Sequence, residues 1–169
     1  MQIYEILFVR NGFEESLKIF QTLSWEQQEV MGVSVYRFEV DSDLALLVYD
    51  LNLASPFSPQ IFEHVKPHLS GLVVVAPQEV DEVEFSGKSW LSDLLEAKTD
   101  IPTVLALQVS EKDYRRLDRK IGEQGLHLGP AARLIYWHAG DEESMRNVWK
   151  TLWLHIGLPK EAETGEKME

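Results

Sequence analysis

The chain has 169 residues, of which 44% are hydrophobic and 26% are charged, and its formal net charge is −12. This length and composition indicate one globular domain with a sizeable core, and the acidic surface argues against nucleic acid or an anionic membrane as the main partner. The lack of cysteine excludes disulfides, thiol catalysis and Cys-based metal sites. No apolar run approaches the roughly 20 residues of a membrane span, and the N-terminus does not read as a signal peptide, so we expect a cytoplasmic protein without membrane insertion.

The first expected element is an apolar strand over residues 3–9, followed by a glycine-containing turn and an amphipathic helix over residues 16–23. A strand, such a turn and a helix that starts near a serine form the layout of a phosphate-binding loop. That loop needs glycine amides around the phosphates and a lysine that reaches them. Here Glu14 and Glu15 precede Ser16, and two carboxylates repel a triphosphate although they suit a helix N-terminus. The layout therefore indicates a nucleotide-binding fold, whereas the residues indicate that nucleotide is not bound in the usual way.

Short apolar strands separated by helical segments follow along the rest of the chain. The expected strands are 33–40, 44–49, 72–76, 103–107 and 133–137, and the expected helices are 59–69, 89–97, 111–124 and 142–156. Asp41-Ser42-Asp43 predicts a hairpin turn between the first two of these strands. This alternation indicates a mainly parallel sheet covered by helices. We expect residues 1–158 to form a single α/β domain and the acidic tail 159–169 to be disordered.

Five segments resemble, in their order and spacing, the strands and loops of one known protein family. They are 31–40, like a strand after switch I; 44–50, like a strand that ends at the switch II aspartate; 70–76; 101–107, like the strand before a guanine-reading motif; and 135–148. In this order the chain resembles the bacterial Ras-like small GTPases, the group that includes the gliding and polarity GTPases. The resemblance implies a Ras-like P-loop NTPase fold: a six-stranded, mainly parallel sheet with one antiparallel strand and helices on both faces.

The resemblance also implies a vestigial nucleotide pocket, made of Asn11, Gly12, Glu14, Glu15, Ser16, Asp50, Gln108, Glu111, His138 and Ala139. Each family motif is changed at the residue that carries its chemistry. The Gly-Lys pair of the loop becomes Glu14-Glu15, the switch I threonine becomes Val30, the switch II glycine becomes Leu53 and the guanine-reading aspartate becomes Glu111. Phosphoryl transfer depends on positioning and on neutralised charge, so the loss of these groups together predicts a pseudo-GTPase with no catalytic residue, metal or cofactor.

The expected function is that of a non-catalytic interaction or regulatory module that binds a protein through its switch-equivalent surface. The partner-binding residues predicted for that surface are Trp25, Met31, Leu51, Leu53, Phe57 and Phe62. By resemblance, a Roadblock-type dimer or a polarity or motility component is the expected partner. In the other interpretation Trp25 folds back over the vacant pocket, and the apolar switch II side chains fill it.

Two further hypotheses remain open. An atypical nucleotide-binding NTPase would hold Mg²⁺ with GTP or GDP through Gly12, Ser16 and Asp50, with Arg10 as the replacement cation. A flavodoxin-like or receiver-like α/β domain is the third. The early hairpin argues against it, and so does Arg10-Asn11, because receivers gather acidic residues after the first strand.

Overall fold

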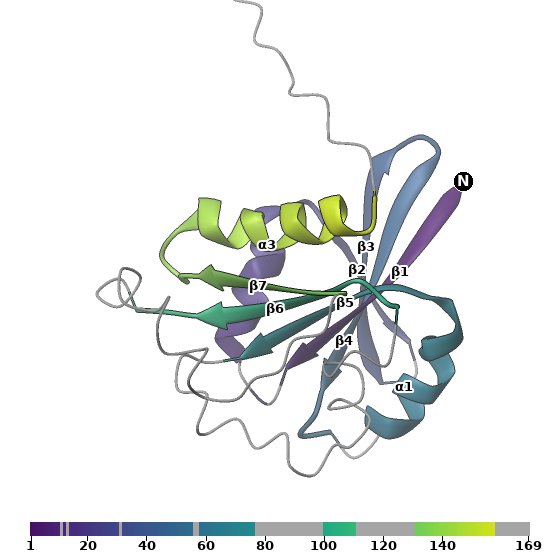
Figure 1. Ribbon diagram of the computed structural model, residues 1–169. Helices are drawn as coiled ribbons and strands as arrows, with labels where there is room; N and C mark the ends of the chain where they lie inside the picture. The colour runs from purple at the N-terminus through teal and green to yellow at the C-terminus, as the bar shows by residue number, and fades with distance from the viewer. Residues whose placement is uncertain are drawn as a thin grey trace, which may run out of the picture.

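The computed structural model describes residues 1–10, 12, 14–30, 32–55, 58–76, 100–110 and 131–157 (Figure 1). Its elements are β1 (Gln2–Arg10), η1 (Glu14–Thr22), β2 (Glu26–Val30), β3 (Val33–Asp41), β4 (Leu44–Asn52), α1 (Ser58–Val65), η2 (Lys66–His68), β5 (Leu69–Ala76), β6 (Thr103–Gln108), β7 (Ala132–Trp137) and α3 (Glu142–His155). The predicted α/β class is confirmed. The predicted helices 89–97 and 111–124, and the tail 159–169, lie outside the described residues.

The strands form one mixed sheet in the order β2-β3-β4-β1-β5-β6-β7. β1 is parallel to both β4 and β5, and the pairs β5–β6 and β6–β7 are also parallel. β3 is antiparallel to β2 and β4, so it is the one strand of this sheet that runs against the others in the described part of the chain. The predicted hairpin turn is confirmed, since residues 42 and 43 form the turn between β3 and β4.

The predicted number of six strands is wrong, because β2 adds a seventh at the edge beside β3. All five residues of β2 are exposed, and Glu-Gln-Gln-Glu-Val has no apolar alternation that would predict a strand. The segment becomes a strand by pairing with β3 across a tight turn, in which Gly32 takes a φ of +78° that other residues rarely adopt. Pairing with β3, rather than a pattern in its own sequence, therefore makes Glu26–Val30 a strand.

The helix predicted over residues 16–23 is instead the 3₁₀ helix η1. In an α-helix the Ile19 carbonyl would accept a hydrogen bond from the amide of Leu23. Here the Leu23 amide donates to Phe20 O (3.4 Å), while Ile19 O accepts from Thr22 Oγ1 (2.8 Å) and from the indole Nε1 of Trp149 (3.0 Å). A hydrogen bond from the side chain of Trp149 thus accompanies the 3₁₀ geometry of η1.

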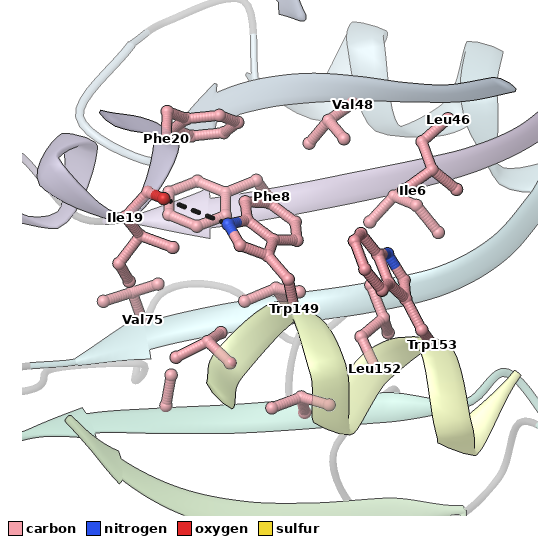
Figure 2. Packing of buried hydrophobic residues seen from close by; sticks show 14 of the residues in the cluster. Ile6, Phe8, Ile19, Phe20, Leu46, Val48, Val75, Trp149, Leu152 and Trp153 are labelled. Atoms are coloured by element: carbon pink, nitrogen blue, oxygen red, sulfur yellow. Dashed lines mark hydrogen bonds between the residues drawn. The ribbon is translucent and has the colours of Figure 1, made fainter. Parts of the chain in front are cut away.

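One face of the sheet is covered by η1 and α3 (Figure 1). Figure 2 shows how Trp149 of α3 lies over Phe8 of β1, with its indole nitrogen directed to Ile19 O. The ring centroids of Phe8 and Phe20 are 4.7 Å apart in an edge-to-face arrangement, which suits aromatic quadrupoles. Trp149 and Trp153 belong to the core, because their exposed fractions are 1% and 8%. Removing side chains of this size from water stabilises the fold by roughly 1.5–3 kcal/mol each.

The other face is covered by α1, whose Phe62 and Val65 are buried among the alternate residues of the central strands. β1 contributes Ile6 and Phe8 to the first face and Leu7 and Val9 to the second, and all four are fully buried. A strand covered on both sides reads as a continuous apolar run, which is why the sequence predicted it correctly. Within the described ranges, no helix has the length and apolar character needed to cross a membrane.

Candidate functional site

The parallel strands β1, β4, β6 and β7 end at one edge of the sheet, which we call the carboxyl edge. The register places Arg10 of β1 opposite Asn52 of β4, and Gln108 of β6 opposite Trp137 of β7. In α/β sheets, ligands bind at the crevice outside these strand ends. The turns that follow the four strands carry the residues predicted for the pocket. The described pocket residues are therefore brought to one side of the molecule, whereas Asn11 and Glu111 lie outside the described residues.

A nearly buried ion pair lies at the centre of the carboxyl edge. Arg10 donates from Nε to Asp50 Oδ1 (2.8 Å) and from Nη2 to Asp50 Oδ2 (3.0 Å), a bidentate geometry that matches the guanidinium fork to the carboxylate. Its third nitrogen, Nη1, donates to Glu14 Oε1 at 3.0 Å. The side chains of Arg10 and Asp50 are only 9% and 6% exposed, whereas that of Glu14 is 73% exposed.

The electrostatics of Arg10 follow from these contacts. Burial by itself lowers the pKa of Arg10, but its hydrogen bond and charge attraction to Asp50, supported by Glu14, raise the pKa above its ordinary value. Arg10 is thus a permanently charged cation held by two carboxylates. Arg10, the cation expected to replace the missing phosphate-binding lysine, is therefore already bound by other side chains of the protein.

The backbone of the turn after β1 is also bound within the protein. The amide of Gly12, at a φ of +63°, donates to Asn52 Oδ1 (2.9 Å), and the same oxygen accepts from the Ala54 amide (3.1 Å). The amide of Leu53 donates to Arg10 O at 2.7 Å. In a phosphate-binding loop the amides of this turn point to an anion. Here the Gly12 amide points to a side chain of the neighbouring strand, which ties the two turns together.

A cavity of about 430 Å³ lies beside this ion pair at the same edge, and we call it the β6–β7 cavity. It is lined by Glu15, Lys18, Gln108, Val109, Ser110, His138, Ala139 and Gly140. Four of these residues, Glu15, Gln108, His138 and Ala139, were predicted for the pocket. Lys18 was missed, although its i, i+3 spacing from Glu15 places the two on one helix face.

Glu15 is the polar centre of the β6–β7 cavity. Gln108 Nε2 donates to Glu15 Oε2 at 2.7 Å, and Lys18 Nζ donates to Glu15 Oε1 at 3.2 Å. The hydrogen bond from Gln108 is the largest cause that lowers the pKa of Glu15 below its ordinary value, followed by the hydrogen bond from Lys18. The side chains of Glu15 and Lys18 are each 44% exposed, so water reaches this cluster.

The loop that carries His138 is fixed by the start of α3. Asp141 caps the helix by accepting from the Glu143 amide (3.0 Å), and the buried Ser144 hydroxyl accepts from the His138 amide (2.9 Å). The amide of Gly140 donates to His138 Nδ1 at 2.9 Å, which places the imidazole proton on Nε2. A Cβ at Gly140 would lie 2.8 Å from the His138 ring, so a larger residue here would require the imidazole to shift.

The residue predicted to hold magnesium, Ser16, is fully buried in η1. In the part of the chain that the structure describes, no three His, Asp or Glu residues come together as a group that could hold a metal ion. The carboxylate of Asp50 is taken by Arg10 in a bidentate pair. As described, the buried Ser16 and the paired Asp50 therefore do not fit the magnesium–phosphate arrangement of a GTPase.

Of the four described residues predicted to bind a partner, three are interior and one is half-buried. Leu51, Leu53 and Phe62 are 1%, 7% and 2% exposed and belong to the core under α1. Met31 and Phe57 lie outside the described residues. Trp25 is half-buried, with ring centroids 5.1 Å from Trp149 and 5.3 Å from Phe38, and its indole nitrogen has no hydrogen-bond partner. The five residues that follow Trp25, which form β2, are all exposed to solvent.

No protein-family model matches the chain, and no curated protein matches it.

Proposed function

We propose that the protein is a non-catalytic module of Ras-like fold, a pseudo-GTPase that acts by binding another protein. The order of the described elements supports this proposal, since a βα unit is followed by a hairpin, a helix and further parallel strands. One added strand, β2, lies at the edge and leaves the order of the other strands unchanged. The fold alone does not define an activity, so the proposal depends on the carboxyl edge.

The observation that carries the proposal is the bidentate pair between Arg10 and Asp50. A nucleotide phosphate at this edge would have to separate the two groups or approach Asp50 and Glu14 as a third anion. Separating a buried ion pair costs about 3–5 kcal/mol, because it leaves a charge without its partner in a region of low polarity. The turn amide of Gly12 is likewise bound to Asn52. At this edge the Arg10 guanidinium and the Gly12 amide are thus both bound by other residues of the protein.

The first test is the nucleotide content of the purified protein, measured by acid release and chromatography, with thermal shifts against GDP, GTP and ATP in the presence of Mg²⁺. We expect no released nucleotide and no change in melting temperature. A tightly bound nucleotide raises the melting temperature by mass action, so a clear shift would contradict the proposal.

A second candidate function, nucleotide binding in a non-standard way, is favoured by the β6–β7 cavity of about 430 Å³. That cavity presents an amide, a carboxylate and an imidazole to a ligand of the size of a nucleobase. The variant Gln108→Ala separates the two functions in the same thermal-shift assay. A shift with wild type that vanishes in this variant would assign the nucleotide to the cavity, whereas a shift of equal size in both would assign it elsewhere on the chain.

A further inference from the structure

Among the described strands, β2 lies at the edge of the sheet, and none of them pairs with its outer side. It lies at the end of the strand order with β3 as its neighbour, and all five of its residues are exposed. The outer backbone amides and carbonyls of an edge strand are a template for pairing with another strand. Natural edges are commonly protected by proline, by a bulge or by charged side chains. Glu26–Val30 contains no proline and pairs with β3 in continuous register, so its protection is the charge of Glu26 and Glu29, which repels an acidic strand and attracts a basic one.

An apolar surface lies beside this open edge. A cavity of about 230 Å³, which we call the edge cavity, extends from Gln28 of β2 across β3 and β4 to the start of β1. Its lining includes Met1, Ile3, Val35, Ala45 and Leu47. Met1 and Ile3 are 65% and 55% exposed, and Val30, on the same face of β2 as Gln28, is 47% exposed. Met1 and Ile3 lie at the far end of the edge cavity, with β3 and β4 between them and β2, so the cavity offers an apolar side chain a place to bind along this face of the sheet.

The charges on β2 determine which strand fits. Glu26 lies opposite Arg37 and Glu29 lies opposite Ser34, so alternation places one carboxylate on each face of the edge. Arg37, which also lines the edge cavity, donates to Glu39 at 2.8 Å, and this contact balances its charge. The chain as a whole carries a net charge of −12, which repels a second copy or an acidic segment.

We propose that β2 is the docking strand for an extended, basic segment of a partner protein. This inference rests on the proposed function as an interaction module. The segment pairs with the outer edge of β2 as an eighth strand. Its backbone supplies the hydrogen bonds, an apolar side chain enters the edge cavity, and Lys or Arg residues meet Glu26 and Glu29. Main-chain pairing of this kind provides affinity, and pockets for alternate side chains provide specificity.

The test uses two capped octapeptides of valine on the full chain, one with lysines three residues apart, so that they lie on both faces as Glu26 and Glu29 do, and one with glutamates at the same positions. Binding is followed by titration calorimetry and by amide hydrogen exchange of Glu26–Val30. We expect the basic peptide to bind about tenfold more tightly than the acidic one, as two exposed charge contacts allow. We also expect it to slow exchange in β2, and high salt to reduce the difference.

Two charge-reversal variants provide the control. Glu26→Lys/Glu29→Lys changes β2, whereas Glu63→Lys/Glu143→Lys makes the same change of net charge at exposed residues of α1 and α3. The β2 variant should prefer the acidic peptide, and the matched variant should keep the preference of the wild type. Equal preference in the two variants would overturn the proposal, since long-range charge alone would then explain binding.

Two other results would also overturn it. One is the absence of any slowed exchange in β2 with the basic peptide at millimolar concentration. The other is concentration-dependent dimerisation of the wild type that Glu26→Lys/Glu29→Lys abolishes, which would make a second copy the occupant. Thermal shifts with GDP and GTP on the same samples keep the two proposals apart. A nucleotide shift contradicts the pseudo-GTPase alone, and a failure of the peptides contradicts the docking strand alone.

Discussion

The two halves of the carboxyl edge use similar groups in opposite ways. In one half, Arg10 and Asp50 are 9% and 6% exposed and bind each other in a bidentate pair. In the other half, Glu15 and Lys18 are each 44% exposed and line a cavity of about 430 Å³. Consecutive glutamates separate the halves, since Glu14 contacts Arg10 and Glu15 contacts Gln108. The comparison teaches that burial, rather than residue type, decides whether charges here hold the fold together or remain available to a ligand.

The variant Arg10→Ala should have the largest effect, because it leaves the buried carboxylate of Asp50 without its partner. We expect the free energy of unfolding to fall by about 3–5 kcal/mol, measured by urea denaturation at neutral pH. The double variant Arg10→Ala/Asp50→Asn removes the charge as well as its partner and should be more stable than the single variant. A loss of less than about 1 kcal/mol in Arg10→Ala would mean that the pair behaves as an exposed one, and the two halves would no longer differ.

The variant Asn52→Ala should have a smaller effect in the same half. It removes the acceptor of the Gly12 and Ala54 amides, and we expect a loss of about 1–2 kcal/mol in the urea experiment. Amide exchange of Gly12 and Ala54 should become faster. Asn52→Asp keeps an oxygen at the same place and serves as the control. If the Gly12 and Ala54 amides exchange as fast in Asn52→Asp as in Asn52→Ala, the side-chain oxygen at residue 52 is not what holds the two turns together.

Gln108→Ala tests the open half and should change the free energy of unfolding by no more than about 0.5 kcal/mol, because water replaces the contact to Glu15. Lys18→Ala, at the other hydrogen bond to Glu15, should have an equally small effect. A loss above about 1.5 kcal/mol in either variant would place the cavity among the structural parts of the fold and would remove the contrast with Arg10.

The smallest expected effect is on the titration of Glu15. Its pKa lies below the ordinary value because the hydrogen bonds from Gln108 and Lys18 favour the charged form. The stability that this provides is present above the pKa of the unfolded chain, near 4.3, and is lost as pH falls through the lower pKa of the folded state. Carboxyl-carbon NMR titration should show the pKa of Glu15 rising in Gln108→Ala. An unchanged value would mean that the amide does not act on the carboxylate in solution.

Several parts of the fold could be predicted from the sequence because their signals are local. β1 is a continuous apolar run covered on both faces, and the final helix begins at the acidic cap Asp141 and carries Trp149 and Trp153 on one side. The Ser42-Asp43 turn has residues that suit a hairpin. Glu15, Gln108 and His138 were expected to lie near one another because the resemblance assigns them to one pocket, and all three line the β6–β7 cavity.

Other parts could not be predicted, because distant groups decide them. β2 has no apolar alternation and is a strand through its ladder with β3. For Leu51, Leu53 and Phe62 the sequence left open a docking surface or an interior position, and the packing of α1 on the sheet buries them. The partner of Arg10 is 40 residues away, at Asp50, and no local pattern shows that the two side chains meet.

The sequence by itself determined the α/β class, the two-sided burial of the central strands and the presence of two consecutive carboxylates, Glu14 and Glu15, after the first strand. These follow from hydrophobic periodicity and from residue charge, which are properties of short segments. The tertiary structure decided what the charges do. It paired Arg10 with Asp50 away from water, left Glu15 at an open cavity and set Glu26–Val30 at an unpaired edge. Burial and pairing depend on which segments the fold brings together, and the strength of a charge interaction depends on that burial.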